Sequence, residues 1–209
     1  MSLQLERGRS LKALNTFAVE ARAACFTEAH DDQAVIEAIY EARRLDVPLW
    51  ILGGGSNLVL TGDVDALVLR MASRGVRVLE DDGQRVVIEA EAGEPWHPFV
   101  LRSLELGLAG RFRADQCEFG YRDSLFKRQA GRYVILRVRF VLRRAAVLSL
   151  EYGPLQQWLQ QHDIHSPTPM DVSRAICSIR SEKLPDPRVL GNAGSFFKNP
   201  LISQSTADA

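Results

Sequence analysis

The stretch Leu49-Trp50-Ile51-Leu52-Gly53-Gly54-Gly55-Ser56-Asn57 is the most informative segment of the chain for its fold. Its first four residues form a short apolar run of the kind found in buried strands. Three glycines follow, and successive backbone amides in such a loop can converge on a phosphate or pyrophosphate. The segment lacks the Gly-Lys-Ser/Thr of a P-loop, and Leu58 stands where a G-x-G-x-x-G fingerprint has its last glycine. A strand leading into an anion-binding loop is one interpretation, and a flexible hairpin is equally compatible.

Periodic apolar residues predict further elements on both sides of this loop. Helices are expected at residues 31–44, 95–106 and 171–184, with Asp31 or Asp32 and then Asp171 as caps. Strands are expected at residues 49–52, 66–69, 85–91 and 134–142, and a turn at 151–154. Because these elements do not alternate in a regular βαβ order, the sequence predicts an α+β fold rather than a doubly wound sheet.

Composition excludes several classes of protein. The chain has 209 residues, and its 26 Lys and Arg residues are balanced by 26 Asp and Glu residues, so no net field favours nucleic acid or an anionic membrane as a partner. Cys25, Cys117 and Cys177 are widely spaced, which is typical of reduced thiols and predicts neither a disulfide framework nor a metal site. No segment resembles a signal peptide or a membrane span, so we expect a cytoplasmic protein.

Two other stretches combine residue types that carry out chemistry. Gly191-Asn192-Ala193-Gly194-Ser195 presents one serine among glycines, and such a hydroxyl can donate a proton or act as a nucleophile. Tyr121-Arg122-Asp123 holds a guanidinium, which can bind a carboxylate through two parallel hydrogen bonds. Each stretch has a structural alternative when it is taken singly. The first can be a tight turn before buried aromatic residues, and the second a surface Arg–Asp pair.

Six segments together carry a resemblance to a known enzyme family, in that family's order and over nearly the whole chain. They are Asn15-Thr16-Phe17, Ile51 to Leu58, Ala92-Gly93-Glu94 with Trp96-His97, Phe119 to Ser124, Lys183 to Pro187, and Gly191 to Pro200. The chain resembles the UDP-N-acetylenolpyruvoylglucosamine reductases, flavoenzymes usually called MurB. Matches of this length in one order are specific, and chance is a poor explanation for them.

The resemblance implies both a fold and a reaction. The implied fold is α+β, with a two-lobed FAD-binding domain of the PCMH/VAO type followed by a truncated MurB-type substrate domain. In the implied reaction, NADPH reduces bound FAD, and the flavin reduces UDP-N-acetylglucosamine enolpyruvate to UDP-N-acetylmuramate, a precursor of peptidoglycan. The expected cofactors are FAD and NADPH. The sugar nucleotide is the expected partner, and no nucleic acid, membrane or metal is expected.

The resemblance also assigns roles by position. Ser195 would protonate the enol carbon of the substrate, and Arg122 would stabilise the negative charge that develops on its carboxylate, so both are expected catalytic residues. The residues expected to cradle the FAD pyrophosphate form the glycine loop: Gly53, Gly54, Gly55, Ser56 and Asn57. The residues expected to bind the substrate or the nicotinamide cofactor are Tyr152, Lys183 and Asn199.

The chain differs from the family's pattern in two places, after Gly110 and at Ala209. By the family's pattern, we expect a Gln-Asn-x-Gly-Ala-Tyr-Gly run and its surroundings to be missing after Gly110, and the third domain, with a catalytic glutamate, to be missing beyond Ala209. We therefore expect lobe 1 and the start of lobe 2 in residues 1–110 and the rest of lobe 2 in residues 111–144. A lid loop, a helix and the catalytic serine segment are expected in residues 145–209. An inactive remnant that binds at most flavin or a nucleotide sugar is an alternative, and an interaction module is a third.

Overall fold

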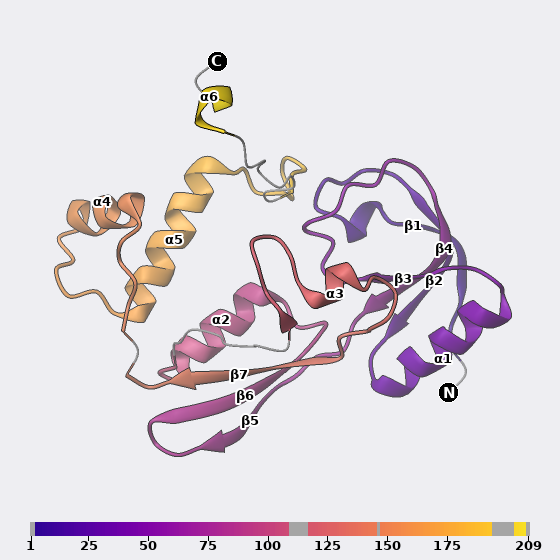
Figure 1. Cartoon of the computed structure of the whole chain (residues 1–209), viewed down its shortest axis with the longest axis horizontal. Coiled ribbons are helices and arrows are strands. Elements are labelled where there is room, and N and C mark those ends of the chain that lie inside the picture. The colour runs from indigo at the N-terminus through magenta and orange to yellow at the C-terminus, as the bar shows by residue number, and fades with distance from the viewer. Residues whose placement is uncertain (1–2, 109–116, 146, 194–202, 208–209) are drawn as a thin grey trace.

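Two β-sheets and the helices beside them form the described part of the chain (Figure 1). The computed structural model describes residues 3–108, 117–145, 147–193 and 203–207. Its separate sheets and helices confirm the α+β class predicted from the sequence. None of the helices in these ranges combines the length and the hydropathy that a bilayer crossing requires.

The first sheet has the strand order β1-β2-β4-β3. Its strands are β1 (Glu6–Ser10), β2 (Arg22–Ala29), β3 (Leu49–Leu52) and β4 (Val64–Met71). β1 lies antiparallel to β2, whereas β2, β4 and β3 are parallel to one another. Much of β2 and β4 is buried, as expected for parallel strands that are covered on both faces. The strands predicted at 49–52 and 66–69 are confirmed, and β2 follows the segment 14–19, which is expected to turn into a strand, while β1 was not predicted.

Helix α1 (Asp32–Arg44) connects β2 to β3 and packs on the first sheet. The Asp31 carboxylate caps it by accepting a hydrogen bond from the backbone N–H of Ala34 at 2.8 Å. Its buried face consists of residues at helical spacing that pack in one core with β2 and β4: Val35, Ala38 and Ala42. The helix predicted at residues 31–44 is therefore confirmed.

The second sheet is antiparallel, in the order β5-β6-β7. Its strands are β5 (Val76–Asp81), β6 (Arg85–Glu91) and β7 (Arg137–Arg143). Helix α2 (Trp96–Glu105) covers one face, where the ring centroids of Phe99 and Phe140 are 4.8 Å apart. β6 lies as predicted, β7 begins three residues later than the predicted strand, and β5 was not predicted. Pro95 is the N-cap of α2 rather than part of its first turn.

Helices α4 (Gly153–Gln161) and α5 (Pro169–Lys183) pack against each other beyond the two sheets (Figure 1). α4 corrects the prediction of a turn at 151–154, because Pro154 occupies the first turn of a helix, where proline needs no hydrogen-bond partner. α5 begins two residues before Asp171, so that prediction was also wrong in detail. Thr168 is the N-cap, and Asp171 completes a capping box with it.

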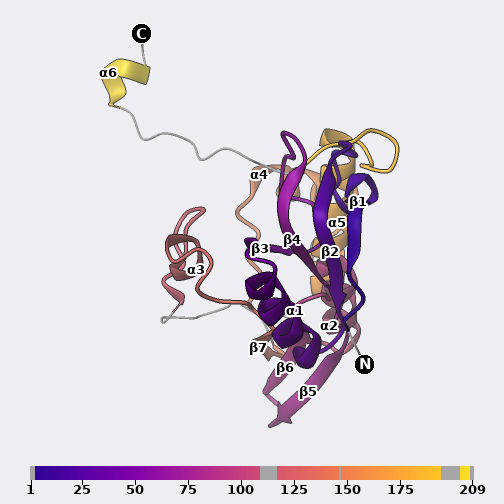
Figure 2. The same ribbon diagram turned by 90° about the vertical axis from the view of Figure 1, so that its right-hand side faces the viewer.

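The remaining elements are short. They are the 3-10 helix η1 (Lys12–Leu14) and the helices α3 (Leu125–Arg128) and α6 (Gln204–Ala207). Figure 2 shows α3 and its flanking chain to one side of both sheets. The Ser124 side chain caps α3 by accepting a hydrogen bond from the backbone N–H of Lys127 at 3.2 Å.

Candidate functional site

The glycine loop begins where β3 ends, as the sequence predicted. Gly55 has φ +65°, a left-handed conformation that favours glycine. A Cβ atom at this position would lie 1.9 Å from the carbonyl oxygen of Leu14. The backbone N–H of Thr16 donates to the carbonyl oxygen of Gly55 at 3.1 Å. Close packing of two backbone segments therefore requires glycine at position 55.

The segment against Gly55 is the turn at residues 15–17, held by a buried asparagine. The Asn15 amide nitrogen donates to the carbonyl oxygens of Leu11 and Val19, at 2.8 and 3.0 Å. Its amide oxygen accepts from the N–H of Val19 at 3.1 Å. With only 7% of its surface exposed, Asn15 fixes the turn by local hydrogen bonds.

A third segment, from the far end of the chain, meets the same turn. A Cβ atom at Gly191 would lie 2.3 Å from the carbonyl oxygen of Phe17. The N–H of Asn192 donates to the carbonyl oxygen of Thr16 at 2.9 Å. Three of the six segments that carry the resemblance therefore meet through their main chains. Ser195, the expected catalytic serine, and Asn199 follow this junction in the sequence but lie outside the described residues.

The rest of the glycine loop is open. No heavy atom lies within 4 Å of the position that a Cβ would take at Gly53 or Gly54 in the described structure. Ser56 and Asn57 are exposed. The hydroxyl oxygen of Thr16 is buried and has no hydrogen-bond partner among the described residues. The open space against Gly53 and Gly54 leaves room for a phosphate group beside the backbone, and a pyrophosphate such as that of FAD fits there.

The Ala92-Gly93-Glu94 segment joins the two sheets. A Cβ at Gly93 would lie 2.5 Å from the carbonyl oxygen of Ser73 and 2.7 Å from that of Met71, at the end of β4. The Glu94 carboxylate accepts a hydrogen bond from the N–H of Gly75 at 3.1 Å. The second sheet is therefore held close to the carboxyl ends of the parallel strands, where α/β sheets commonly bind ligands.

Arg122, the expected catalytic arginine, lies on a tight turn before α3. Gly120 and Asp123 exchange backbone hydrogen bonds at 3.0 and 3.3 Å, and Arg122 between them has φ +52°. Its guanidinium lies 5.8 Å from the centre of the Tyr121 ring. A non-glycine residue in the left-handed region stores strain, a feature that clusters at binding and catalytic sites. Asp123 binds Arg128 at 2.6 Å, so an ion pair that the sequence did not predict supports the turn.

Two of the predicted substrate-binding residues lie on the helices beyond the sheets. Tyr152 is the N-cap residue of α4 and is 50% exposed. Lys183 is the last residue of α5 and is also exposed. Thr16 and Gly191 received no role from the sequence, although both belong to segments that carried the resemblance. Their role depends on backbone contacts between segments that are far apart in the sequence, and only the three-dimensional fold shows these contacts.

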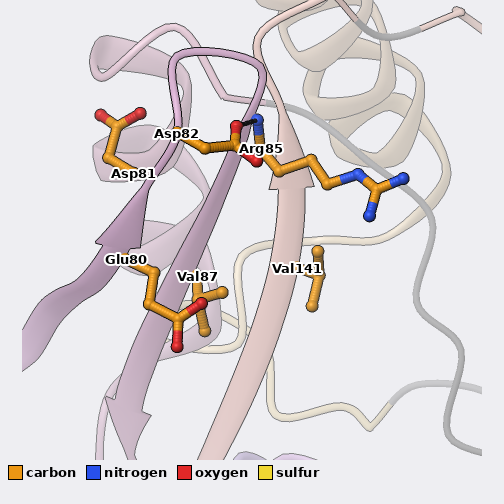
Figure 3. Close-up of a pocket in the computed structure, with 6 residues that line it drawn as sticks. All are labelled: Glu80, Asp81, Asp82, Arg85, Val87 and Val141. Carbon is orange, nitrogen blue, oxygen red and sulfur yellow. Dashed lines mark hydrogen bonds between the residues drawn. The ribbon is translucent and has the colours of Figure 1, made fainter.

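Figure 3 shows a hollow on the second sheet. It is lined by Glu80, Asp81, Asp82, Arg85, Val87 and Val141. The backbone N–H of Gly83 donates a hydrogen bond that lowers the pKa of the Asp81 carboxyl. The backbone N–H of Arg85 lowers the pKa of the Asp82 carboxyl in the same way. These carboxylates close the turn. In the described part of the chain, no group of three or more His, Cys, Asp or Glu residues could hold a metal ion.

Comparison with known proteins identifies the family. Residues 23–118 match the family model described as an FAD binding domain. The chain is 54% identical to the UDP-N-acetylenolpyruvoylglucosamine reductase of Pseudomonas fluorescens (strain Pf0-1), over 97% of the chain and 73% of the relative. It is 47% identical to the reductase of the same name from Pseudomonas aeruginosa PAO1, over 100% of the chain and 74% of the relative. The chain belongs to the UDP-N-acetylenolpyruvoylglucosamine reductase family.

The fold agrees with that of a solved member of this reductase family. The enzyme from Thermus caldophilus superposes with a TM-score of 0.52 at 20% identity, over 95% of this chain and 76% of that enzyme. The alignment with the Pseudomonas fluorescens reductase extends over 247 positions, more than the 209 residues of this chain. That reductase therefore contains residues inside the matched region that this chain lacks, which agrees with the internal gap expected from the sequence. The expected position of the gap, after Gly110, lies outside the described residues.

Proposed function

We propose that this chain binds FAD and acts as a UDP-N-acetylenolpyruvoylglucosamine reductase, with NADPH as reductant and UDP-N-acetylglucosamine enolpyruvate as substrate. The observation that carries the proposal is the main-chain junction of residues 15–17, the glycine loop and residues 191–192. Next to this junction, Gly53 and Gly54 border open space, so a pyrophosphate can approach the backbone there. The product, UDP-N-acetylmuramate, would place the protein in peptidoglycan precursor synthesis in the cytoplasm.

Individual residues of this chain would have different roles in the reaction. When bound, FAD would take a hydride from NADPH and deliver one to the enolpyruvyl group. Arg122 would stabilise the negative charge that develops on the substrate carboxylate, since a guanidinium makes two parallel hydrogen bonds to such a group. Ser195 would hold the proton for the enol carbon. Tyr152, Lys183 and Asn199 would bind the sugar nucleotide or the nicotinamide cofactor.

The domain limits remain part of this proposal. Residues 1–110 would form lobe 1 and the start of lobe 2, and residues 111–144 the rest of lobe 2. Residues 145–209 would supply the lid loop, the helix and the serine segment. On this division lobe 1 contains the first sheet and lobe 2 the second.

The test begins with the visible spectrum of the purified chain before and after addition of FAD. A flavin spectrum that stays with the protein through gel filtration is the expected result. NADPH oxidation that depends on the enolpyruvyl substrate is then expected as well. A protein that retains no flavin would overturn the proposal. Flavin retention without NADPH oxidation would leave the inactive remnant as the better description.

A matched pair of variants tests the glycine loop itself. Gly54→Val fills space that is open in the structure, so it should weaken FAD binding without a change in the thermal unfolding temperature of the FAD-free protein. Gly62→Val is the control, because a Cβ at Gly62 also meets no atom within 4 Å. Equal FAD affinities for the two variants would show that the loop is not the cradle.

A further inference from the structure

We propose that Arg137 is a positioning residue that fixes the angle between the two sheets, and that FAD affinity depends on this angle. This inference rests on the proposed function. Arg137 is the first residue of β7, in the second sheet. Its guanidinium reaches Asp32 in the first turn of α1, which packs on the first sheet. A single side chain thereby links two structural units that are far apart in the sequence.

The contact geometry is that of a bridge. One terminal nitrogen of Arg137 lies 2.7 Å from a carboxylate oxygen of Asp32. The Nε atom lies 2.8 Å from a carboxylate oxygen of Glu91, at the end of β6. The guanidinium therefore uses both sides of its planar fork, one toward each sheet. The side chains of Arg137, Glu91 and Asp32 are 32%, 14% and 46% exposed, so solvent screens the Arg137–Glu91 pair less than the Arg137–Asp32 pair that links the sheets.

The other contacts between the two sheets are apolar packing and the close backbone approach of Gly93 to Met71 and Ser73. Val134, Leu136 and Ala92 pack against the apolar core of the first sheet. Apolar contacts are non-directional, and such an interface tolerates sliding and rotation. A planar guanidinium that donates to two different carboxylates constrains direction as well as distance. We therefore assign the angle between the sheets to Arg137 and the adhesion between them to the apolar contacts.

The residues that match the FAD-binding family model connect the angle between the sheets to FAD binding. The residues that match the FAD-binding family model, 23–118, include strands β2 to β4 of the first sheet and β5, β6 and α2 of the second. A cofactor bound by both units has its full set of contacts only at one angle. If the competent arrangement is a fraction of the population, the apparent affinity falls by that fraction.

Arg139 provides a matched control on the same strand and the same face. Its Nε atom lies 2.7 Å from a carboxylate oxygen of Glu89, so it makes the same kind of ion pair entirely within the second sheet. We expect Arg137→Met to raise the FAD dissociation constant by about tenfold, the effect of losing one charge-assisted hydrogen bond between the units. Arg139→Met should leave it within about twofold. Arg137→Lys should fall between these variants, because an ammonium cannot bridge both carboxylates in the same geometry.

A second measurement reports the angle directly and needs no cofactor. Spin labels at Arg43→Cys on α1 and Gln84→Cys on the β5–β6 turn give a distance distribution by pulsed electron paramagnetic resonance. Cys117 and Cys177, which are not buried, are first replaced by serine. Without FAD, Arg137→Met should broaden or shift the distribution, and Arg139→Met should leave it unchanged.

These outcomes separate this proposal from the proposed function. Failure of the unmodified chain to bind FAD would overturn the function, while the distance distributions would still decide the role of Arg137. Identical distributions in the two methionine variants would overturn the positioning role. A broadened distribution with unchanged FAD affinity would overturn the dependence of binding on the angle.

Discussion

Replacement of Gly55 by alanine should destabilise the fold by an amount that can be worked out from the structure. A left-handed alanine costs about 1–2 kcal/mol more than a left-handed glycine. The added Cβ would lie 1.9 Å from the carbonyl oxygen of Leu14, so the two backbones must separate. Separation breaks the hydrogen bond from the N–H of Thr16 to Gly55, at a cost of about 1–3 kcal/mol if the groups stay buried. The expected total is about 2–5 kcal/mol.

The assay is thermal unfolding of the FAD-free chain, followed by far-ultraviolet circular dichroism. For a chain of this length, the expected loss lowers Tm by roughly 4–20 °C. Gly54→Ala is the internal control, because its φ is not left-handed and no atom lies within 4 Å of the new Cβ. Its Tm should stay within about 2 °C of the unmodified value. Equal Tm values for the two variants would refute the assignment of Gly55 to the backbone junction.

Three further predictions concern the core, one helix cap and an exposed ion pair after α5. Ile88→Ala, in the fully buried core of the second sheet, should lower the free energy of unfolding by about 2–5 kcal/mol in a urea titration. Thr168→Ala should cost about 1 kcal/mol through loss of the capping box. The hydrogen bond from Thr168 lowers the pKa of Asp171, so the capping contribution should persist above the ordinary carboxyl pKa and disappear as pH falls through the lowered value. The hydrogen bond from Arg188 lowers the pKa of Asp186 to about 2, and a nuclear magnetic resonance titration should show this value return toward 3.8 in Arg188→Met.

The helices and strands that the sequence predicted well are those with a buried, periodic face. α1 has an aspartate cap and apolar residues at helical spacing, and both signals act locally. β5 was missed because all its residues after Val76 are exposed, so no alternation of buried and exposed positions marks it. α4 was mistaken for a turn because Gly153-Pro154 is compatible with both structures until the packing of Leu155 and Leu159 decides between them.

The sequence also predicted only part of the candidate site. The sequence located the glycine loop, but it could not separate Gly55, which packs against backbone, from Gly53 and Gly54, which face open space. That difference depends on the position of Leu14, which the tertiary fold determines. The sequence did not predict the role of Arg137. Its partner Asp32 lies on α1, far away in the sequence, and only the tertiary fold brings the two side chains together.

Thr16 shows why the junction and the proposed cofactor site are one structure. Its N–H donates to Gly55 and its carbonyl oxygen accepts from Asn192, so both main-chain groups are used to hold the segments together. Its hydroxyl oxygen is buried and has no partner in the described part of the chain, and an unsatisfied buried hydroxyl lowers stability. FAD bound at the glycine loop, next to Thr16, should stabilise the fold at the point where the three segments meet, because a ligand that binds only the folded state shifts the equilibrium toward it.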